Sequence, residues 1–214
     1  MTTYAEQADQ LRKQYNARLE ALRNRRDLSD DGKRRQIAKL KVETSDAMRK
    51  LTKQNNEATE QRKRRLLDHV FGNTAVLPSQ VVAQRDALDR AAKIKTAKEA
   101  ADALELARFN GDHQLAKAIA MRSYDNALGH PAVSGEWAAV INRWAENEPA
   151  SVDEALTELS EIHGEQQSHT ARMTQSMRFS VSEPTELRGK NTDQLAAQAD
   201  REGNDEAEGL PNAG

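Results

Sequence analysis

Residues 28–40 read LSDDGKRRQIAKL and mark a turn between two long helical patterns. Ser29 carries the hydroxyl of a helix N-cap, and the two aspartates after it suit the positive end of a helix. On both sides of this turn, apolar residues recur in steps of three and four, as on one face of a helix. The pattern predicts one helix that starts near residue 3 and a second from about residue 30 to about residue 70. We expect them to form an antiparallel hairpin or coiled coil.

The apolar stripe of these two helices is narrow. Residues 1–60 contain only about a dozen large apolar side chains, which is too few for an independent globule. We therefore expect another copy of the chain, or another protein, to complete the helical seam. The seam residues are Tyr4, Leu11, Tyr15, Leu22, Ile37, Leu40 and Leu51.

Residues 73–163 show a different pattern, of about five short helices separated by helix-terminating residues. Thr96 and Glu99 have the spacing of a capping box, and Asn110-Gly111-Asp112 supplies a C-cap followed by an N-cap. No run of alternating apolar residues indicates a sheet. The segment predicts a small helical bundle in an all-α protein. Its expected core includes Trp137, Val140, Ile141 and Trp144.

Residues 164–214 are rich in Gln, Ser, Thr, Asn, Glu and Gly, and their composition is typical of a mostly disordered acidic tail. One exception is the segment Met173, Met177, Phe179 and Val181. The last three alternate, as in a peptide added to a sheet edge, whereas the two methionines match one face of a helix. The segment predicts a short docking motif for a partner. A strap that packs on the protein's own short-helix bundle and an incidental cluster remain open.

Charge divides the chain into the same three regions. Residues 1–72 hold 18 Lys and Arg against 11 Asp and Glu, which makes them basic. Residues 73–163 hold 9 against 14, and residues 164–214 hold 5 against 9, so both are acidic. The formal net charge of −2 conceals this separation. It indicates an interaction arm and a folded body, and it leaves open head-to-tail association of the arm with the acidic body of another copy.

The composition excludes several classes of protein. Cysteine is absent, so disulfides, cysteine-ligated zinc and thiol catalysis are excluded. Charged residues make up 31% of the chain and the mean hydropathy is −0.88. No stretch approaches the ~20 apolar residues that a membrane span needs, and the N-terminus lacks the apolar core of a signal peptide. We expect no membrane partner and a cytoplasmic (bacterial host) or virion-associated protein that is not secreted.

The sequence offers no catalytic residues. None of the five histidines has a second histidine four positions away, and no carboxylate pair is spaced for acid–base work. The chain also lacks the glycine-rich motifs that bind nucleotide phosphates and the pattern of a nucleophilic serine. We therefore expect a protein that is not an enzyme, with no metal, no cofactor and no small-molecule substrate.

One basic cluster supports an alternative function. Arg62, Lys63, Arg64 and Arg65 follow each other on the predicted second helix and would neutralise phosphates. Few aromatic residues accompany them, so a solvated helix surface is the simpler interpretation. Contact with nucleic acid, or with an acidic protein surface, stays open.

The turn LSDDGKRRQIAKL is followed by ALELARFNGDHQLAKAIAMRSYDNAL and EWAAVINRWAENEP. Over residues 28–149 this order resembles small helical proteins encoded among the structural genes of actinobacterial tailed phages. The resemblance implies a role in the virion or in capsid assembly rather than catalysis, and it carries over no catalytic residues. Many phage scaffolding proteins dock through a basic helical C-terminus, whereas this C-terminus is acidic. A scaffold-like role and a capsid- or connector-associated role both remain open.

Together these observations predict a non-enzymatic structural or assembly protein that acts through protein–protein contacts. We expect its partners to be other copies of itself, other structural proteins, or both. The alternative is a nucleic-acid-binding protein that uses the basic N-terminal helices.

Overall fold

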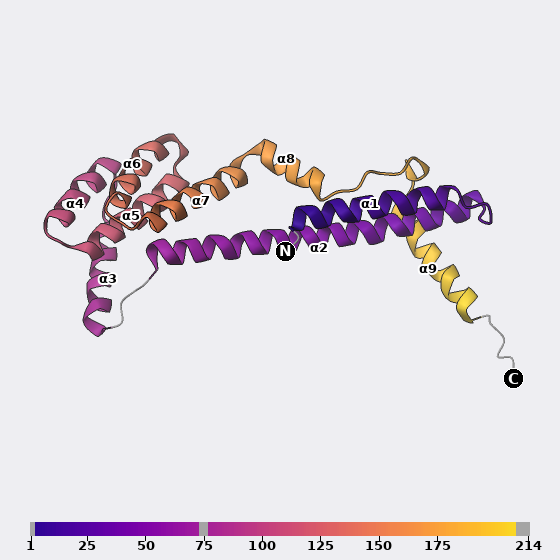
Figure 1. Ribbon diagram of the computed structural model, residues 1–214, viewed down its shortest axis with the longest axis horizontal. Helices are drawn as coiled ribbons and strands as arrows, with labels where there is room; N and C mark the ends of the chain where they lie inside the picture. The colour runs from indigo at the N-terminus through magenta and orange to yellow at the C-terminus, as the bar shows by residue number, and fades with distance from the viewer. Residues whose placement is uncertain (1–2, 73–76, 209–214) are drawn as a thin grey trace. The chain divides into compact units, whose positions relative to one another are not determined.

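The computed structural model describes residues 3–72 and 77–208, with side chains described up to residue 201. This part of the chain contains nine α-helices, two short 3₁₀ helices and no strand (Figure 1). The predicted all-α class is therefore confirmed for these residues. The chain forms two compact units, of which unit 1 comprises residues 1–60 and 165–214 and unit 2 comprises residues 61–164.

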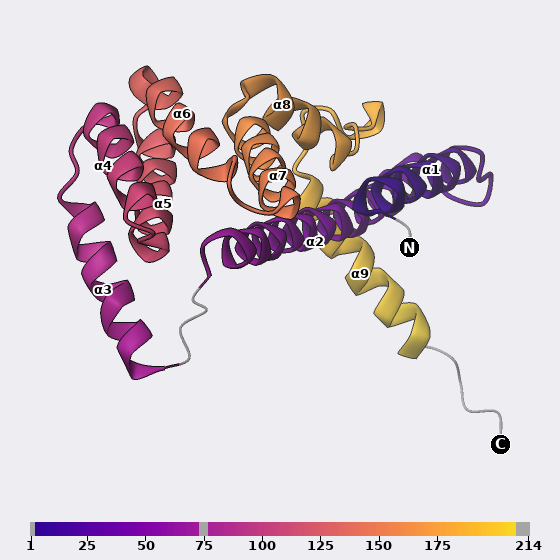
Figure 2. The same ribbon diagram turned by 60° about the vertical axis from the view of Figure 1, so that its left-hand side comes forward.

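Unit 1 is built on α1 (Tyr4–Arg23) and the first part of α2 (Asp30–Phe71). Thr3 and Glu6 cap α1 reciprocally: the Glu6 amide donates to the Thr3 hydroxyl at 3.2 Å, and the Thr3 amide donates to the Glu6 carboxylate at 2.8 Å. The hydroxyl of Ser29 accepts from the amide of Gly32 at 3.1 Å, so α2 begins where the turn sequence indicates. The two helices run side by side in both ribbon views (Figures 1 and 2).

The rest of unit 1 comes from the C-terminal part of the chain. It consists of the end of α7 (Ala150–Gln167), α8 (His169–Arg178), η2 (Thr185–Leu187) and α9 (Thr192–Glu208). Phe179, Leu187 and Ala196 lie in apolar clusters with residues of α1 and α2. We call residues 179–199 the strap, because their buried side chains pack on these two helices.

These contacts differ from the prediction that residues 164–214 are mostly disordered. Up to residue 208 they contain α8, η2 and α9, and Leu187 is fully buried. The reason is that the strap's apolar side chains are buried on α1 and α2, which offsets the entropy of ordering the chain. Residues 209–214 lie outside the described part.

The division of the chain also differs from the predicted one at residues 72 and 163. Unit 2 takes the last turns of α2, because Leu66, Leu67, Val70 and Phe71 pack into the core of the short helices. Unit 1 takes the C-terminal segment as well as the N-terminal helices. After Gly32 in its first turn, α2 contains no glycine or proline, so nothing in its sequence reveals that its two parts belong to different cores.

Unit 2 corresponds to the predicted small bundle. It contains α3 (Pro78–Ala92), α4 (Ala97–Phe109), α5 (His113–Gly129), η1 (Pro131–Val133), α6 (Ser134–Ala145) and most of α7. Gly111 adopts a φ of 68° between α4 and α5, a left-handed conformation that favours glycine. Asp112 then caps α5 by accepting from the Leu115 amide at 3.0 Å.

The core of unit 2 is continuous. α5 packs against α3, α4 and α6 and buries residues along most of its length. Phe71 stacks on Trp144, with ring centres 5.8 Å apart, and meets Tyr124 at 5.6 Å. All four residues of the expected bundle core are buried in this cluster: Trp137, Val140, Ile141 and Trp144.

Candidate functional site

α1 and α2 each carry two rows of side chains in coiled-coil spacing, and the two rows are one residue apart. The covered row comprises residues 8, 12, 15 and 19 of α1 and residues 37, 41, 44 and 48 of α2. The open row comprises residues 7, 11, 14, 18 and 21 of α1 and residues 36, 40, 43, 47, 50 and 54 of α2, and it is bordered by Gln10, Leu22, Lys39 and Leu51 and by Arg25, which follows the end of α1. In both rows the steps alternate between four and three residues, as in a heptad repeat.

The strap and the end of α8 pack against the covered row. Arg12 donates to the main-chain carbonyl of Met177 at 3.2 Å, and Lys41 donates to that of Val181 at 2.5 Å. The Tyr15 hydroxyl donates to the carbonyl of Ser182 at 3.4 Å. Burial, followed by the nearby Glu183 carboxylate, raises the pKa of Tyr15 to about 12. The covered row is therefore occupied by the chain's own C-terminal segment.

A two-pronged ion pair fixes the middle of the strap. Arg23 Nε lies 2.6 Å from Glu186 Oε1, and Arg23 Nη2 lies 3.0 Å from Glu186 Oε2. The hydrogen bond from Arg23 lowers the pKa of Glu186 to about 2, and the same contact raises the pKa of Arg23. Such a forked pair is more directional than a single-contact surface ion pair.

The structure divides the predicted docking segment into two parts. Phe179 is buried beside Ala8 and Met48, and Val181 packs against both clusters on α1 and α2. Met173 and Met177 lie four residues apart on α8 and are 57% and 64% exposed. The strap alternative thus describes the first pair, although it packs on α1 and α2 rather than on the short-helix bundle. Only the two methionines remain available to a partner.

The predicted seam residues are brought together in unit 1. Tyr15, Ile37 and Leu40 are buried, and the other four are partly buried against the same clusters. Part of their burial comes from the strap. The chain itself therefore covers part of the seam that the sequence predicted another copy would cover. The sequence signal for this packing is the apolar residues at 179, 181 and 187. The sequence does not specify which helices they pack against.

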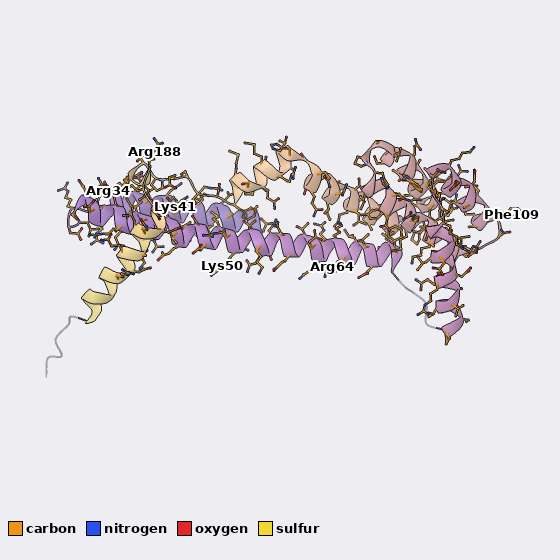
Figure 3. All side chains as sticks on the ribbon, turned by 180° about the vertical axis from the view of Figure 1, so that it is seen from behind. Arg34, Lys41, Lys50, Arg64, Phe109 and Arg188 are labelled. Atoms are coloured by element: carbon orange, nitrogen blue, oxygen red, sulfur yellow. The ribbon has the colours of Figure 1, made fainter. Side chains whose placement is uncertain are left out.

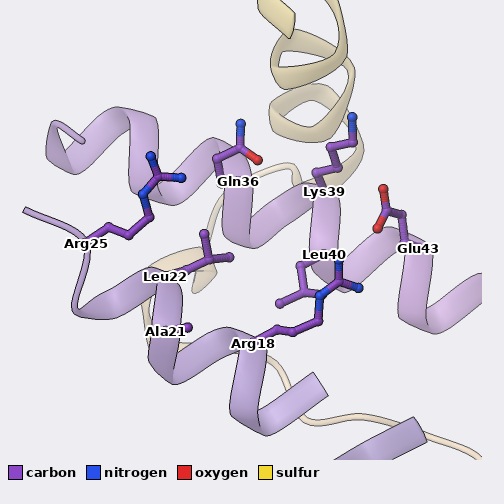
Figure 4. Close-up of a pocket in the computed structure, with 8 residues that line it drawn as sticks. All are labelled: Arg18, Ala21, Leu22, Arg25, Gln36, Lys39, Leu40 and Glu43. Atoms are coloured by element: carbon purple, nitrogen blue, oxygen red, sulfur yellow. The ribbon is translucent and has the colours of Figure 1, made fainter. Parts of the chain in front are cut away.

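The open row lines a groove between α1 and α2. One cavity of about 350 Å³ is bordered by Leu22 and Leu40, and a second of about 380 Å³ by Leu11 and Leu51. In Figure 4 the apolar side chains of the first cavity lie between the two helices, with charged side chains around them. Ala21 and Ala47 also line the groove and leave it wide. The groove has an apolar base and a polar rim.

The charges on the rim are partly neutralised within the chain. Arg25 pairs with Asp27, and Lys39 pairs with Asp200 at 2.5 Å. Arg18 on α1 and Glu43 on α2 line the same cavity and are both exposed. Neither forms an ion pair with any residue in the described part of the chain. Near its middle, the groove therefore presents one cation and one anion outside any close ion pair, and Glu43 also interacts electrostatically with Lys39.

The basic cluster of α2 belongs to unit 2. Arg62 forms an ion pair with Glu158 of α7, which raises the pKa of the guanidinium. Lys63, Arg64 and Arg65 form no ion pair within residues 3–72 and 77–201, and the two arginines are exposed. Figure 3 shows Arg64 on α2. Three of the four predicted cations therefore remain available to an anionic partner.

A second exposed feature of unit 2 was not anticipated. Leu106 is 61% exposed and Phe109, at the end of α4, is 88% exposed (Figure 3). They lie three residues apart, outside the buried row Ala97, Ala100, Leu104 and Ala107. That spacing off the buried face is the sequence signal that could have identified them.

Neither the described side chains nor the comparison with known proteins indicates a further site. No three His, Cys, Asp or Glu side chains in the described part lie close enough to hold a metal ion. In that same part, no helix is both long and apolar enough to cross a membrane. Comparison with protein-family models, curated proteins and solved structures finds no match to this chain.

Proposed function

We propose that this protein is a non-enzymatic structural or assembly protein that acts through protein–protein contacts. We further propose that it takes part in virion or capsid assembly of a tailed phage. The hairpin of α1 and α2 would provide an interaction arm, and unit 2 would provide a folded body.

This proposal rests on the open row of α1 and α2. Heptad-spaced residues normally face another helix. Here the covered row packs against the strap and the end of α8, while the open row lines a groove. An apolar base with a polar rim is also the organisation of protein-binding surfaces. Met173 and Met177 on α8, and Leu106 and Phe109 on α4, add exposed apolar side chains in each unit.

The phage role draws on the order of the turn and helix sequences over residues 28–149, which resembles phage structural-module proteins. Such proteins act by binding to one another or to a capsid shell, and this function needs surfaces rather than a catalytic centre. The exposed apolar residues in both units fit that requirement.

Co-sedimentation with capsid shells tests the proposal. The full chain is co-expressed with the shell protein of an actinobacterial tailed phage, and assembled shells are pelleted. We expect the chain in the pellet. We also expect Ala47→Arg, which fills the groove, to reduce its recovery at least about tenfold. Ala83→Arg makes the same change on an exposed site of α3 and should leave recovery unchanged. A chain that stays in the supernatant at both low and physiological salt contradicts the proposal.

The alternative is nucleic-acid binding, and it is favoured by the three unpaired cations Lys63, Arg64 and Arg65. A fluorescence-anisotropy titration with duplex DNA at low and physiological salt tests it. Binding through phosphates should weaken steeply with salt, and Arg64→Gln with Arg65→Gln should weaken it at low salt. Arg34→Gln removes a cation that is already paired with Asp31 and serves as the control. The absence of binding at low salt rejects this alternative.

A further inference from the structure

We propose that the open row binds the open row of a second copy of this chain, so that two α1/α2 hairpins form a four-helix coiled coil. The two-fold axis runs parallel to the helices, which places α1 of one copy beside α2 of the other. This dimer rests on the proposed function, because that function assigns the groove to a protein partner and the dimer names the partner as a second copy.

The residue spacing gives the two helices a common register. Because α1 and α2 run antiparallel, residue 7 lies level with residue 54, residue 14 with residue 47, and residue 25 with residue 36. At each level of the groove, α1 contributes one residue or two adjacent residues, and α2 does the same. A two-fold axis along the helices sets each level against the same level of the second copy.

Two of these levels are apolar. Leu11 and Leu51, both partly buried, share one cavity, and Leu22 and Leu40 share the other, where Leu40 is 5% exposed because it also packs in the cluster with Leu187. The two-fold axis doubles each pair into a layer of four leucines, which is the core of an antiparallel four-helix bundle. Ala47 sits between the two apolar levels and Ala21 beside the second. Their small side chains allow the second pair of helices to approach closely.

The charges match in the same arrangement. Arg18 and Glu43 lie level with each other and lack ion-pair partners among the described residues. The two-fold axis brings Arg18 of each copy beside Glu43 of the other, so that two ion pairs form in one layer. Lys50 then faces Gln10, and Arg25 faces Gln36, so no like charges stand directly opposite.

The other face-to-face arrangement fits less well. A two-fold axis perpendicular to the helices would set α1 against α1 and α2 against α2. Arg18 would then face Gln14 of the second copy instead of Glu43, and Lys50 would face Leu40. The paired leucines at the base of the groove also favour a helix over nucleic acid as the occupant, because phosphates gain nothing from an apolar surface.

A charge exchange tests both the partner and the arrangement. The full-length protein is followed by sedimentation equilibrium from about 1 µM to about 1 mM. The wild type should form a dimer. Arg18→Glu and Glu43→Arg should each raise the dissociation constant at least about tenfold, because each places two like-charge pairs in the middle layer. Combining both substitutions should return the constant to within about threefold of wild type.

Lys13→Glu provides the matched control, because Lys13 is an exposed cation of α1 outside both rows. It should not change the dissociation constant. A wild type that stays monomeric at 1 mM overturns the proposal. So does an Arg18→Glu protein that associates like Lys13→Glu, or a double variant that stays as weak as the single ones. A monomer whose DNA binding is weakened by Arg18→Glu would overturn it in favour of nucleic acid.

The result is separable from that of the shell experiment, because self-association is measured on the purified chain alone. A monomer that pellets with capsid shells contradicts the dimer and leaves the proposed function standing. A dimer that does not pellet with shells contradicts the assembly role and leaves the interface standing.

Discussion

Unit 2 and unit 1 bury their apolar residues in different ways. Unit 2 has one continuous core made by short helices that follow one another along the chain. Unit 1 has two small clusters, and both depend on residues of the strap, more than a hundred positions away in sequence from α1. The comparison shows that a large local core stabilises one unit, whereas long-range contacts complete the other and leave a groove uncovered.

The largest expected effect is on unit 2. Trp144 is 3% exposed and stacks on Phe71, so Trp144→Ala should lower the free energy of unfolding of unit 2 by about 3–5 kcal/mol. Both tryptophans lie in unit 2, so the fluorescence of the remaining Trp137 in a urea titration reports on this unit. A loss below about 1 kcal/mol would mean that the core does not hold unit 2 together.

A smaller effect is expected from the strap. Leu187 is fully buried among residues of α1 and α2, so Leu187→Ala should destabilise unit 1 by about 2–4 kcal/mol. Far-UV circular dichroism should show an earlier helix transition, while tryptophan fluorescence stays at its wild-type midpoint.

Met177→Ala is the control for this comparison. Met177 is 64% exposed, and its loss should change the midpoint by less than about 0.5 kcal/mol. If Leu187→Ala shifts both signals equally, the two units unfold together and the contrast between them disappears.

The smallest effect comes from the ion pair between Arg23 and Glu186. The folded-state pKa of Glu186 is lowered from 4.5 to about 2, so the pair stabilises unit 1 above pH 4.5. That contribution is lost as the pH falls from 4.5 toward about 2. Both side chains are partly exposed, so Glu186→Gln should cost only about 1 kcal/mol at pH 7.

The pH profile checks this prediction. Circular dichroism melts of wild type and Glu186→Gln should differ at pH 7 and converge at low pH. The variant should lose less stability than wild type over that range. A constant difference at every pH would mean that Glu186 acts through packing rather than through its charge.

Much of the secondary structure could be predicted from the sequence. The turn at Ser29 and the Gly111 junction carry local signals, because hydroxyl caps and left-handed glycines satisfy their own neighbouring amides. The burial of Trp137 and Trp144 likewise follows from large apolar side chains at helical spacing.

The strap could not be predicted in the same way. Phe179, Val181 and Leu187 are separated by polar residues in a segment of low apolar content, which is the composition of disorder. They become ordered because α1 and α2 offer an apolar surface to them. The exposure of Phe109 was not predicted either, although Leu106 and Phe109 lie off the buried face of α4.

By itself, the sequence determined an all-helical protein with long N-terminal helices and a tryptophan-containing bundle. These features follow from periodicity and caps, which act over a few residues. Only the tertiary structure decided which of the two heptad rows is covered, because that depends on where a distant segment of the chain returns. The row that the strap leaves open, with Arg18 and Glu43 unpaired in its middle, is the surface on which the proposed assembly depends.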